Sequence, residues 1–274
     1  MTGRTPVPRG RNLLSNMLTV PELLADPPKL HAFKQTLATP DGMFAPGELI
    51  NRWKLSDEEL LFISKHIGKG SKTLETGAGC STVLFTLLGA NHTCIVPDKP
   101  LTERIVAFCK EKRIPTDKLN FIVEVSEQAL PRLQERDFDL ALIDGRHGFP
   151  QPFLDWYYMA EALKVGGYVV IDDLHVWVCE TLMNLLMAEK DWKLVHESLG
   201  GCAFQKLGNG TQNNDYENQP YVAGKSRQFS LSAKGRYMLS LLRRGNYGLF
   251  SDTLKLAIQS AFMGKFGERP KGRR

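Results

Sequence analysis

From residue 71 onward, the hydrophobic and polar positions of the chain alternate between two patterns. Short apolar runs typical of buried strands are followed by longer segments whose apolar residues recur every three or four positions, as in amphipathic helices. Strands are expected at residues 72–75, 92–96, 119–123, 138–143 and 168–171. Helices are expected at residues 82–88, 102–112, 127–134, 153–163 and 176–189. This alternation predicts a parallel sheet that is covered by helices on both faces.

The two ends of this alternating region have their own signals. Before it, Ser56 and Glu59 have the spacing of a capping box and predict the start of a further helix. After it, the segments 192–197 and 202–206 are separated by a short loop with two glycines, which predicts a β-hairpin. The fold class expected is therefore α/β, with a Rossmann-like, doubly wound, seven-stranded sheet of five parallel strands and a terminal antiparallel hairpin.

The remaining segments divide the chain into four predicted parts. Residues 1–52 are rich in proline and turn-forming residues and are interpreted as a helical cap or lid, and residues 53–207 form the sheet domain. Residues 208–224 are a polar linker rich in glycine and asparagine, and residues 225–274 are a basic extension. Within this extension one helical stripe is expected at 251–262, and the last ten residues are expected to fray.

Composition narrows the class of protein. The chain is 42% hydrophobic and 24% charged, which is ordinary for a globular protein and excludes a disordered chain or a rod. No run approaches 18 apolar residues, and no apolar segment follows the basic N-terminus as in a secretory signal. The five cysteines form no C-x-x-C pair, so neither a disulfide framework nor a zinc site is expected. These features together favour a cytoplasmic protein.

The net charge is unevenly distributed. Residues 225–274 hold twelve Lys and Arg against two acids, so the net +5 of the chain divides into +10 on this extension and −5 on residues 1–224. The basic extension is interpreted by default as a solvated face or an oligomer arm. Contact with nucleic acid or with an anionic membrane remains the less favoured alternative.

The clearest chemical motif is the turn after the first predicted strand, which reads Glu75-Thr76-Gly77-Ala78-Gly79. Two glycines at a strand-to-helix turn allow the backbone to approach a ligand closely. A dinucleotide-binding loop has a third glycine where this chain has Thr82, and Glu75 would repel a pyrophosphate but accept a hydrogen bond from an ammonium group. The residues therefore favour a cofactor that joins an amino acid to a nucleoside over NAD.

This loop resembles motif I of the class I S-adenosylmethionine-dependent methyltransferases, and the resemblance spans roughly Trp53 to Leu207. It implies that S-adenosyl-L-methionine is the cofactor. The cofactor-binding residues it implies are Glu75, Thr76, Gly77, Ala78, Gly79, Ser81, Asp98 and Asp144. The family binds the ribose with an acid at the end of the second strand, but Val96 or Pro97 occupies that place here, and Asp98 follows it.

Acidic side chains follow the next two strands of the predicted sheet. Asp144 and His147 come after the fourth strand, and Asp172, Asp173 and His175 come after the fifth. In an open α/β sheet such residues meet at the edge where ligands bind. Clustered carboxylates repel one another unless they are protonated or bridged by a cation, and Mg²⁺ prefers oxygen ligands. A plainer interpretation is that Asp144 lies near the adenine or caps a helix, and that Asp173 caps the next helix.

The same two segments resemble those of macrocin-type O-methyltransferases, which act on small molecules. This resemblance implies a divalent metal, such as Mg²⁺, held by Asp144, Asp172 and Asp173. It also implies methyl transfer to a hydroxyl oxygen. Asp144, His147 and His175 are the candidate catalytic residues, as proton acceptors or acceptor contacts.

The aromatic segment after Asp144 has two interpretations. Phe153, Trp156 and Tyr157 are adjacent to the predicted reactive site and could line an apolar acceptor pocket. Their i, i+3, i+4 spacing also fits packing of a helix on the sheet, which is the favoured interpretation.

The sequence as a whole predicts a methyltransferase that acts on a small molecule. If the basic extension is an oligomer arm, the protein is expected to form a homo-oligomer. One alternative is a non-catalytic protein that binds S-adenosylmethionine and uses the basic extension for a partner. A second alternative is a nicotinamide-dependent oxidoreductase, which Glu75 and Thr82 disfavour.

Overall fold

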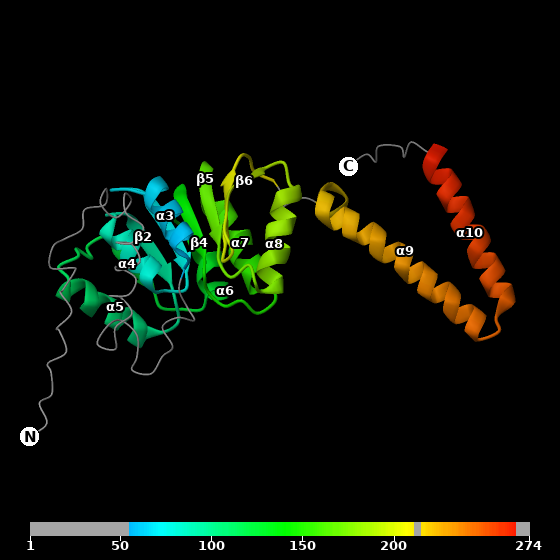
Figure 1. The fold of residues 1–274 in the computed structure, drawn as a ribbon, viewed down its shortest axis with the longest axis horizontal. Coiled ribbons are helices and arrows are strands. Elements are labelled where there is room, and N and C mark those ends of the chain that lie inside the picture. Colours follow the sequence, from blue (N-terminus) through cyan, green and yellow to red (C-terminus); the bar gives the residue numbers. More distant parts are fainter. Residues whose placement is uncertain (1–54, 211–214, 267–274) are drawn as a thin grey trace, which may run out of the picture. The chain divides into compact units, whose positions relative to one another are not determined.

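The computed structural model describes residues 55–210 and 215–266 of the 274-residue chain. It divides into two compact units, residues 1–214 and 215–274 (Figure 1). The predicted cap at residues 1–52 and the last eight residues of the chain lie outside the described ranges. None of the helices within those ranges is long and apolar enough to cross a membrane.

The first unit contains a seven-stranded sheet. Its strands, in chain order, are β1 (Lys72–Thr76), β2 (Asn91–Ile95), β3 (Leu119–Ile122), β4 (Phe138–Ile143), β5 (Leu163–Ile171), β6 (Trp192–Glu197) and β7 (Cys202–Lys206). They are arranged in the order β3-β2-β1-β4-β5-β7-β6. The first five pair in parallel, and β7 pairs antiparallel with both β5 and β6. The predicted fold class, including the terminal hairpin, is confirmed.

Helices connect these strands. They are α3 (Asp57–His66), α4 (Cys80–Leu87), α5 (Lys99–Glu111), α6 (Ser126–Ala129), the 3₁₀ helix η2 (Leu130–Arg132), α7 (Gln151–Ala162) and α8 (Trp177–Ala188). The capping box of α3 is present, since the Ser56 side chain accepts from the Glu59 amide and the Glu59 carboxylate accepts from the Ser56 amide. The helix expected at 127–134 is instead the short pair α6 and η2, because Pro131 lacks an amide hydrogen.

The core lies on both sides of the sheet. On one face, apolar residues of α3, α4 and α5 form a single cluster with Leu140 and Leu142 of β4 and Val170 of β5. The intervening residues Ala141 and Ile143 are equally buried and point to the opposite face, since side chains alternate along a strand. There α7 contacts β4, β5 and α8. Packing on both faces leaves the carboxyl ends of the parallel strands as the edge where a ligand can enter.

The second unit is a helical hairpin made of α9 (Pro220–Arg243) and α10 (Tyr247–Phe266), preceded by the short 3₁₀ helix η4 (Tyr216–Asn218). The stripe expected at 251–262 lies inside the longer α10. The sequence analysis missed α9, which begins inside the segment that was expected to be a linker. Its glycines and serines and its scattered cations obscured the helical period, although Pro220 occupies the first turn, where proline is favourable.

Candidate functional site

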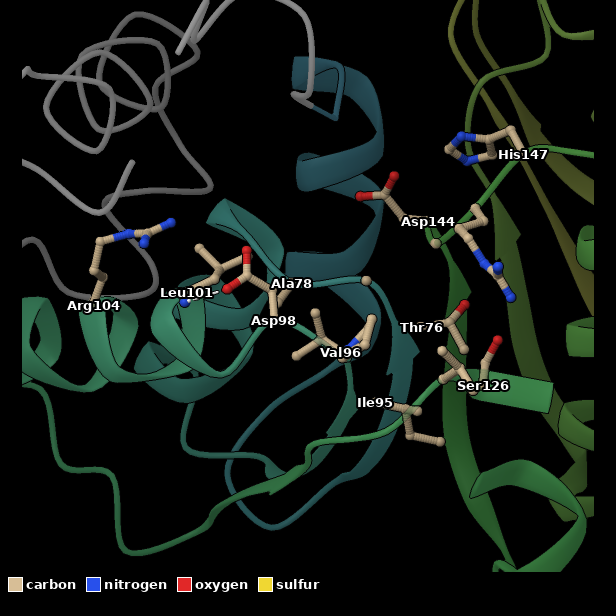
Figure 2. A pocket seen from close by; sticks show the side chains of 15 residues that line it. Thr76, Ala78, Ile95, Val96, Asp98, Leu101, Arg104, Ser126, Asp144 and His147 are labelled. Atoms are coloured by element: carbon tan, nitrogen blue, oxygen red, sulfur yellow. Dashed lines mark hydrogen bonds between the residues drawn. The ribbon is translucent and has the colours of Figure 1, made fainter. Parts of the chain in front are cut away.

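A cavity of about 340 Å³ opens at the carboxyl ends of the parallel strands. This volume is in the range of small-molecule sites. Figure 2 shows Asp98, Leu101 and Arg104 on one side of it and Asp144 and His147 on the other. The cavity is lined by Thr76, Gly77, Ala78, Ile95, Val96, Pro97, Asp98, Leu101, Arg104, Val125, Ser126, Asp144, Gly145, Arg146 and His147.

The glycine loop forms the wall of the cavity at the end of β1. Gly77 has φ +87°, and a Cβ atom at this position would lie 2.0 Å from the backbone oxygen of Asp144. Both the dihedral angle and the close approach therefore require glycine. The Gly77 amide donates to the Ile95 carbonyl at 3.0 Å, which ties the loop to the end of β2. At Gly79, by contrast, a Cβ atom would meet nothing within 4 Å.

Glu75 lies beneath this loop and is absent from the cavity wall. Its side chain is fully buried and accepts a hydrogen bond from the Thr82 hydroxyl, which in turn accepts from the Gly79 amide. His92 Nε2 lies 3.1 Å from Glu75 Oε1, and His92 Nδ1 lies 2.8 Å from the Thr73 hydroxyl oxygen. This buried network connects two strands with the loop, so Glu75 is placed to hold the loop.

The other predicted cofactor residues divide into two groups. Thr76, Ala78 and Asp98 line the cavity together with Gly77, whereas Ser81 is buried behind it at the start of α4. Asp98 caps α5, because its Oδ1 accepts from the Leu101 amide at 2.9 Å. The structure therefore brings Asp98 to the cavity beside Val96 and Pro97, the two residues to which the resemblance assigns the position of a ribose-binding acid.

The sequence analysis missed part of the cavity. Val125 and Ser126 line it directly after β3, and Arg104 reaches it from the second turn of α5. The first two residues could have been found by the rule that also led to Asp144, since they follow the carboxyl end of a neighbouring strand. Arg104 lies inside a helix and belongs to no motif, so no local signal marked it.

An acidic cluster forms the end of the cavity nearest β4 and β5. One ligand atom each of Asp144, His147 and Asp173 lies within 4.8 Å of the others. His147 Nδ1 is 3.1 Å from Asp173 Oδ2, and the more exposed His175 has its Nδ1 3.5 Å from Asp173 Oδ1. Asp173 has φ +59°, a left-handed conformation that is uncommon outside glycine and is found at functional sites.

Asp172 extends this cluster below the cavity. Its side chain is buried and is hydrogen-bonded to the Asp144 carboxyl group. Burial raises the pKa of Asp172 to about 8, with a further contribution from the negative charge of Glu59. Burial also raises the pKa of Asp144, with contributions from Asp172, Glu75 and Asp173. The cluster therefore holds protons at neutral pH unless a cation neutralises it.

His147 has the environment of a neutral imidazole. Burial lowers its pKa, and only part of this shift is offset by the charge of Asp173. Its Nε2 is buried and has no hydrogen-bond partner among the residues that the structure describes. Since Asp173 lies next to Nδ1, it favours the tautomer in which Nδ1 carries the hydrogen and Nε2 has the free lone pair. This nitrogen can accept a proton or bind a cation.

The cluster fits a divalent cation by its chemistry. Two carboxylates and an imidazole are a common set of ligands, and a cation would relieve the repulsion between the acids. The predicted set of Asp144, Asp172 and Asp173 is thus brought together, with His147 closer to Asp144 and Asp173 than the sequence could show. His175 remains at the exposed edge of the cluster.

The aromatic segment after Asp144 serves mainly in packing. Trp156 is buried, and its ring centroid lies 6.3 Å from that of Trp192 in the hairpin. Phe153, Trp156 and Tyr157 are absent from the cavity lining. Trp156 therefore belongs to the contact between α7 and the hairpin.

Comparisons with known proteins bear on the domain that contains this cavity. Residues 74–174 match the profile of a family described as a methyltransferase domain. This segment begins in β1 and ends just after the acidic pair of Asp172 and Asp173, so it contains the glycine loop and every residue of the cluster except His175. No curated protein matches the sequence.

Among solved structures, a cofactor-bound protein from MTB, Rv0187, superposes with a TM-score of 0.53 at 16% identity, over 75% of this chain and all of that one. The O-methyltransferase TomG from Streptomyces achromogenes, in complex with SAM, has a TM-score of 0.48 and 15% identity, over 71% of this chain and 93% of that one. A methyltransferase from Geobacter sulfurreducens has a TM-score of 0.49 and 14% identity, over 66% of this chain and 90% of that one.

The fold, the matched segment and the glycine loop define the class of this protein. It carries a class I methyltransferase domain that depends on S-adenosylmethionine. The protein is accordingly an enzyme of the methyltransferase class.

Proposed function

We propose that this enzyme transfers the methyl group of S-adenosylmethionine to a hydroxyl oxygen of a small molecule, with a divalent cation at the acidic cluster. The observation that carries the proposal is the cluster itself, where Asp144, His147 and Asp173 converge at a cavity that the adjacent glycine loop also lines. A nucleophile bound at the cluster would lie next to the cofactor.

The cavity offers each part of the cofactor a suitable environment. Gly77 and Ala78 would contact the methionine part, and the carboxylate of Asp98 would accept hydrogen bonds from the ribose hydroxyls. The adenine ring would lie among apolar side chains near the ends of β2 and β3, including Ile95 and Val125. Asp144 would stand near the positive sulfonium, which favours its charged form.

The reaction needs alignment and the removal of one proton. The acceptor oxygen forms a bond to the methyl carbon while the carbon–sulfur bond breaks, and sulfur keeps that electron pair to give S-adenosylhomocysteine. His147 Nε2 takes the hydroxyl proton, and Asp173 stabilises the imidazolium that results. A divalent cation held by Asp144 and Asp173, with Asp172 behind them, would lower the pKa of the acceptor hydroxyl.

The test uses purified enzyme, methyl-labelled S-adenosylmethionine and a panel of sugars, phenols and catechols, with mass spectrometry to locate the added methyl group. We expect methylation at oxygen, stimulated by Mg²⁺ and suppressed by EDTA. His147→Gln should lower kcat by about 100-fold or more while S-adenosylhomocysteine still binds, because the base acts only on the acceptor.

The pH profile gives a second readout. Since burial lowers the pKa of His147, kcat/KM should fall only below the ordinary histidine value of about 6.5. Asp144→Asn should remove the Mg²⁺ stimulation. Methylation of nitrogen, or full activity of His147→Gln at neutral pH, would contradict the proposal.

A further inference from the structure

The helical hairpin formed by α9 and α10 is rich in both cations and exposed apolar side chains. Residues 220–266 contain eight Lys and Arg and one acid, Asp252. The 24 residues of α9 have five of these cations and no acid. A helix of this kind has no acid of its own to pair with its cations.

On α9 the two kinds of side chain share one face. Lys225, Phe229, Arg236, Leu239 and Arg243 recur at the spacing of helical turns and lie within about 80° of the helix circumference, over about 27 Å of its length. All five are exposed, Phe229 at 68% and Leu239 at 56%. The Arg236 guanidinium lies 5.9 Å from the centre of the Phe229 ring.

The second helix adds more apolar surface. Leu254 and Ile258 are exposed on one side of α10 and Leu249 and Leu256 on another, with exposed fractions between 38% and 66%. The only buried large apolar side chain of the described part of the hairpin is Leu241. The apolar residues of this unit are thus too many to be explained by the contact between its two helices.

We infer that the α9–α10 hairpin binds the surface of an anionic lipid bilayer. Long cationic side chains on such a helix extend to lipid phosphates while neighbouring Phe and Leu side chains enter the region below the headgroups. The cations distributed along α9 fit a helix that lies on the surface, in agreement with the absence of a spanning helix among the described residues.

Two other partners fit less well. Nucleic acid would use the cations and could stack on the exposed rings of Phe229, Tyr237 and Tyr247, but it would leave the exposed Leu and Ile side chains of both helices in water. Pairing of two hairpins would bury the apolar residues, but it would also bring together two surfaces of the same strong positive charge, with Asp252 as the single acid on each to offset it.

Flotation of the full-length protein with lipid vesicles tests the inference. One set of vesicles is pure phosphatidylcholine, and the other contains 30% phosphatidylglycerol. We expect binding to the anionic set only, weakening as NaCl rises, because the attraction is screened by salt. Failure to float with the anionic vesicles, or equal binding to both sets, would overturn it.

Variants locate the surface. Changing Lys225, Arg236 and Arg243 to Gln should weaken binding by about fivefold per charge and about 100-fold in all. The matched control removes the same charge from the first unit by changing the exposed Lys110, Lys118 and Lys193 to Gln, and should leave binding within about twofold of the wild type. Equal losses in the two triple variants would contradict the inference.

A second variant tests the apolar part. Phe229→Ser with Leu239→Ser keeps every charge, and should weaken binding by about tenfold or more while the salt dependence remains. Circular dichroism must show that each variant keeps its helix content. A single-stranded RNA that displaces the protein from the vesicles, or a dimer that replaces vesicle binding in sedimentation velocity, would assign the surface to that partner instead.

Discussion

The side chains beneath the glycine loop show how single residues control a backbone that a cofactor must touch. The Thr82 hydroxyl is the link between the Gly79 amide and the Glu75 carboxylate. Glu75 is buried, and its polar neighbours are this donor and the His92 ring, whose Nε2 lies 3.1 Å from Oε1. Loss of one link leaves a buried polar group without its partner, which costs more than the bond itself contributes.

Thr82→Val should therefore lower both stability and cofactor affinity. The side chain keeps its shape but leaves Glu75 without a donor and releases the Gly79 amide, so we expect a loss of about 1–3 kcal/mol in the free energy of unfolding. Urea unfolding and titration calorimetry with S-adenosylhomocysteine measure the two effects.

Thr86→Val, one turn further along α4, is the matched control. Its hydroxyl donates to the Thr82 carbonyl at 2.7 Å and has no bond to the loop. It should lose stability at most, with its affinity for S-adenosylhomocysteine unchanged. If both variants bound the ligand as the wild type does, the buried network would have no role in the loop.

Asp172 should make stability depend on pH. Its pKa of about 8 in the folded protein lies above the ordinary value of about 3.9, so the folded state holds the proton more tightly than the unfolded state does. Stability is therefore lost as pH rises from about 4 through 8. Asp172→Asn should be more stable than the wild type by about 5 kcal/mol at pH 8 and by less than about 1 kcal/mol at pH 4.

Thermal unfolding in EDTA at the two pH values checks this difference. The same variant should also lose the stimulation of activity by Mg²⁺. A gain in stability together with this loss would show that Asp172 serves activity at a cost to stability. A wild-type melting temperature that rises toward pH 8 in EDTA would contradict the assignment.

At the scale of elements, the two glycines of the loop differ in what they require. Gly77→Ala should lose more than about 3 kcal/mol of stability, since its Cβ would meet the Asp144 carbonyl in a dihedral region that is unfavourable for alanine. Gly79→Ala should fold with nearly wild-type stability, since its Cβ would have open space. Equal stability of the two variants in urea unfolding would contradict the geometry of the loop.

Most elements of the sheet domain could be predicted because the hydrophobic periodicity of each segment agrees with its place in the alternation of strands and helices. The parallel strands are continuous apolar runs, and the hairpin bounds at 192–197 and 202–206 match the structure. The amino end of β5 was missed, since the strand was expected only from Tyr168, after Gly166 and Gly167, and it begins before them, at Leu163. The helix α9 was missed because its exposed residues mix apolar and cationic side chains on one face.

The site could be predicted only where it follows strand ends. Asp144 and Asp173 were found by this rule, and the structure brings both to one cluster. The burial of Glu75 could not be predicted, because it depends on His92 and Thr82, which approach from other elements. The pairing of His147 with Asp173 likewise depends on the geometry of two loops.

At the scale of the whole molecule, the division into two units predicts that the first unit binds the cofactor without the second. The glycine loop, the acidic cluster and all residues that line the cavity belong to residues 1–214. A chain that ends at Asn214 should therefore bind S-adenosylhomocysteine with an affinity within about twofold of the full chain, by calorimetry. The same chain should lose flotation with anionic vesicles. Loss of cofactor binding on truncation would show that the second unit supports the first.

The contact between Gly77 and the Asp144 carbonyl also has a thermodynamic meaning. The backbone at Gly77 would face the cofactor, and the backbone at Asp144 carries an acid of the cluster where the acceptor would bind. The two backbones are in contact with no flexible side chain between them. We therefore expect a ligand that immobilises one of these loops to pre-order the other, so that the second ligand loses less entropy on binding. By linkage this cooperativity would be reciprocal, and cofactor and acceptor would each tighten the other's binding by the same factor.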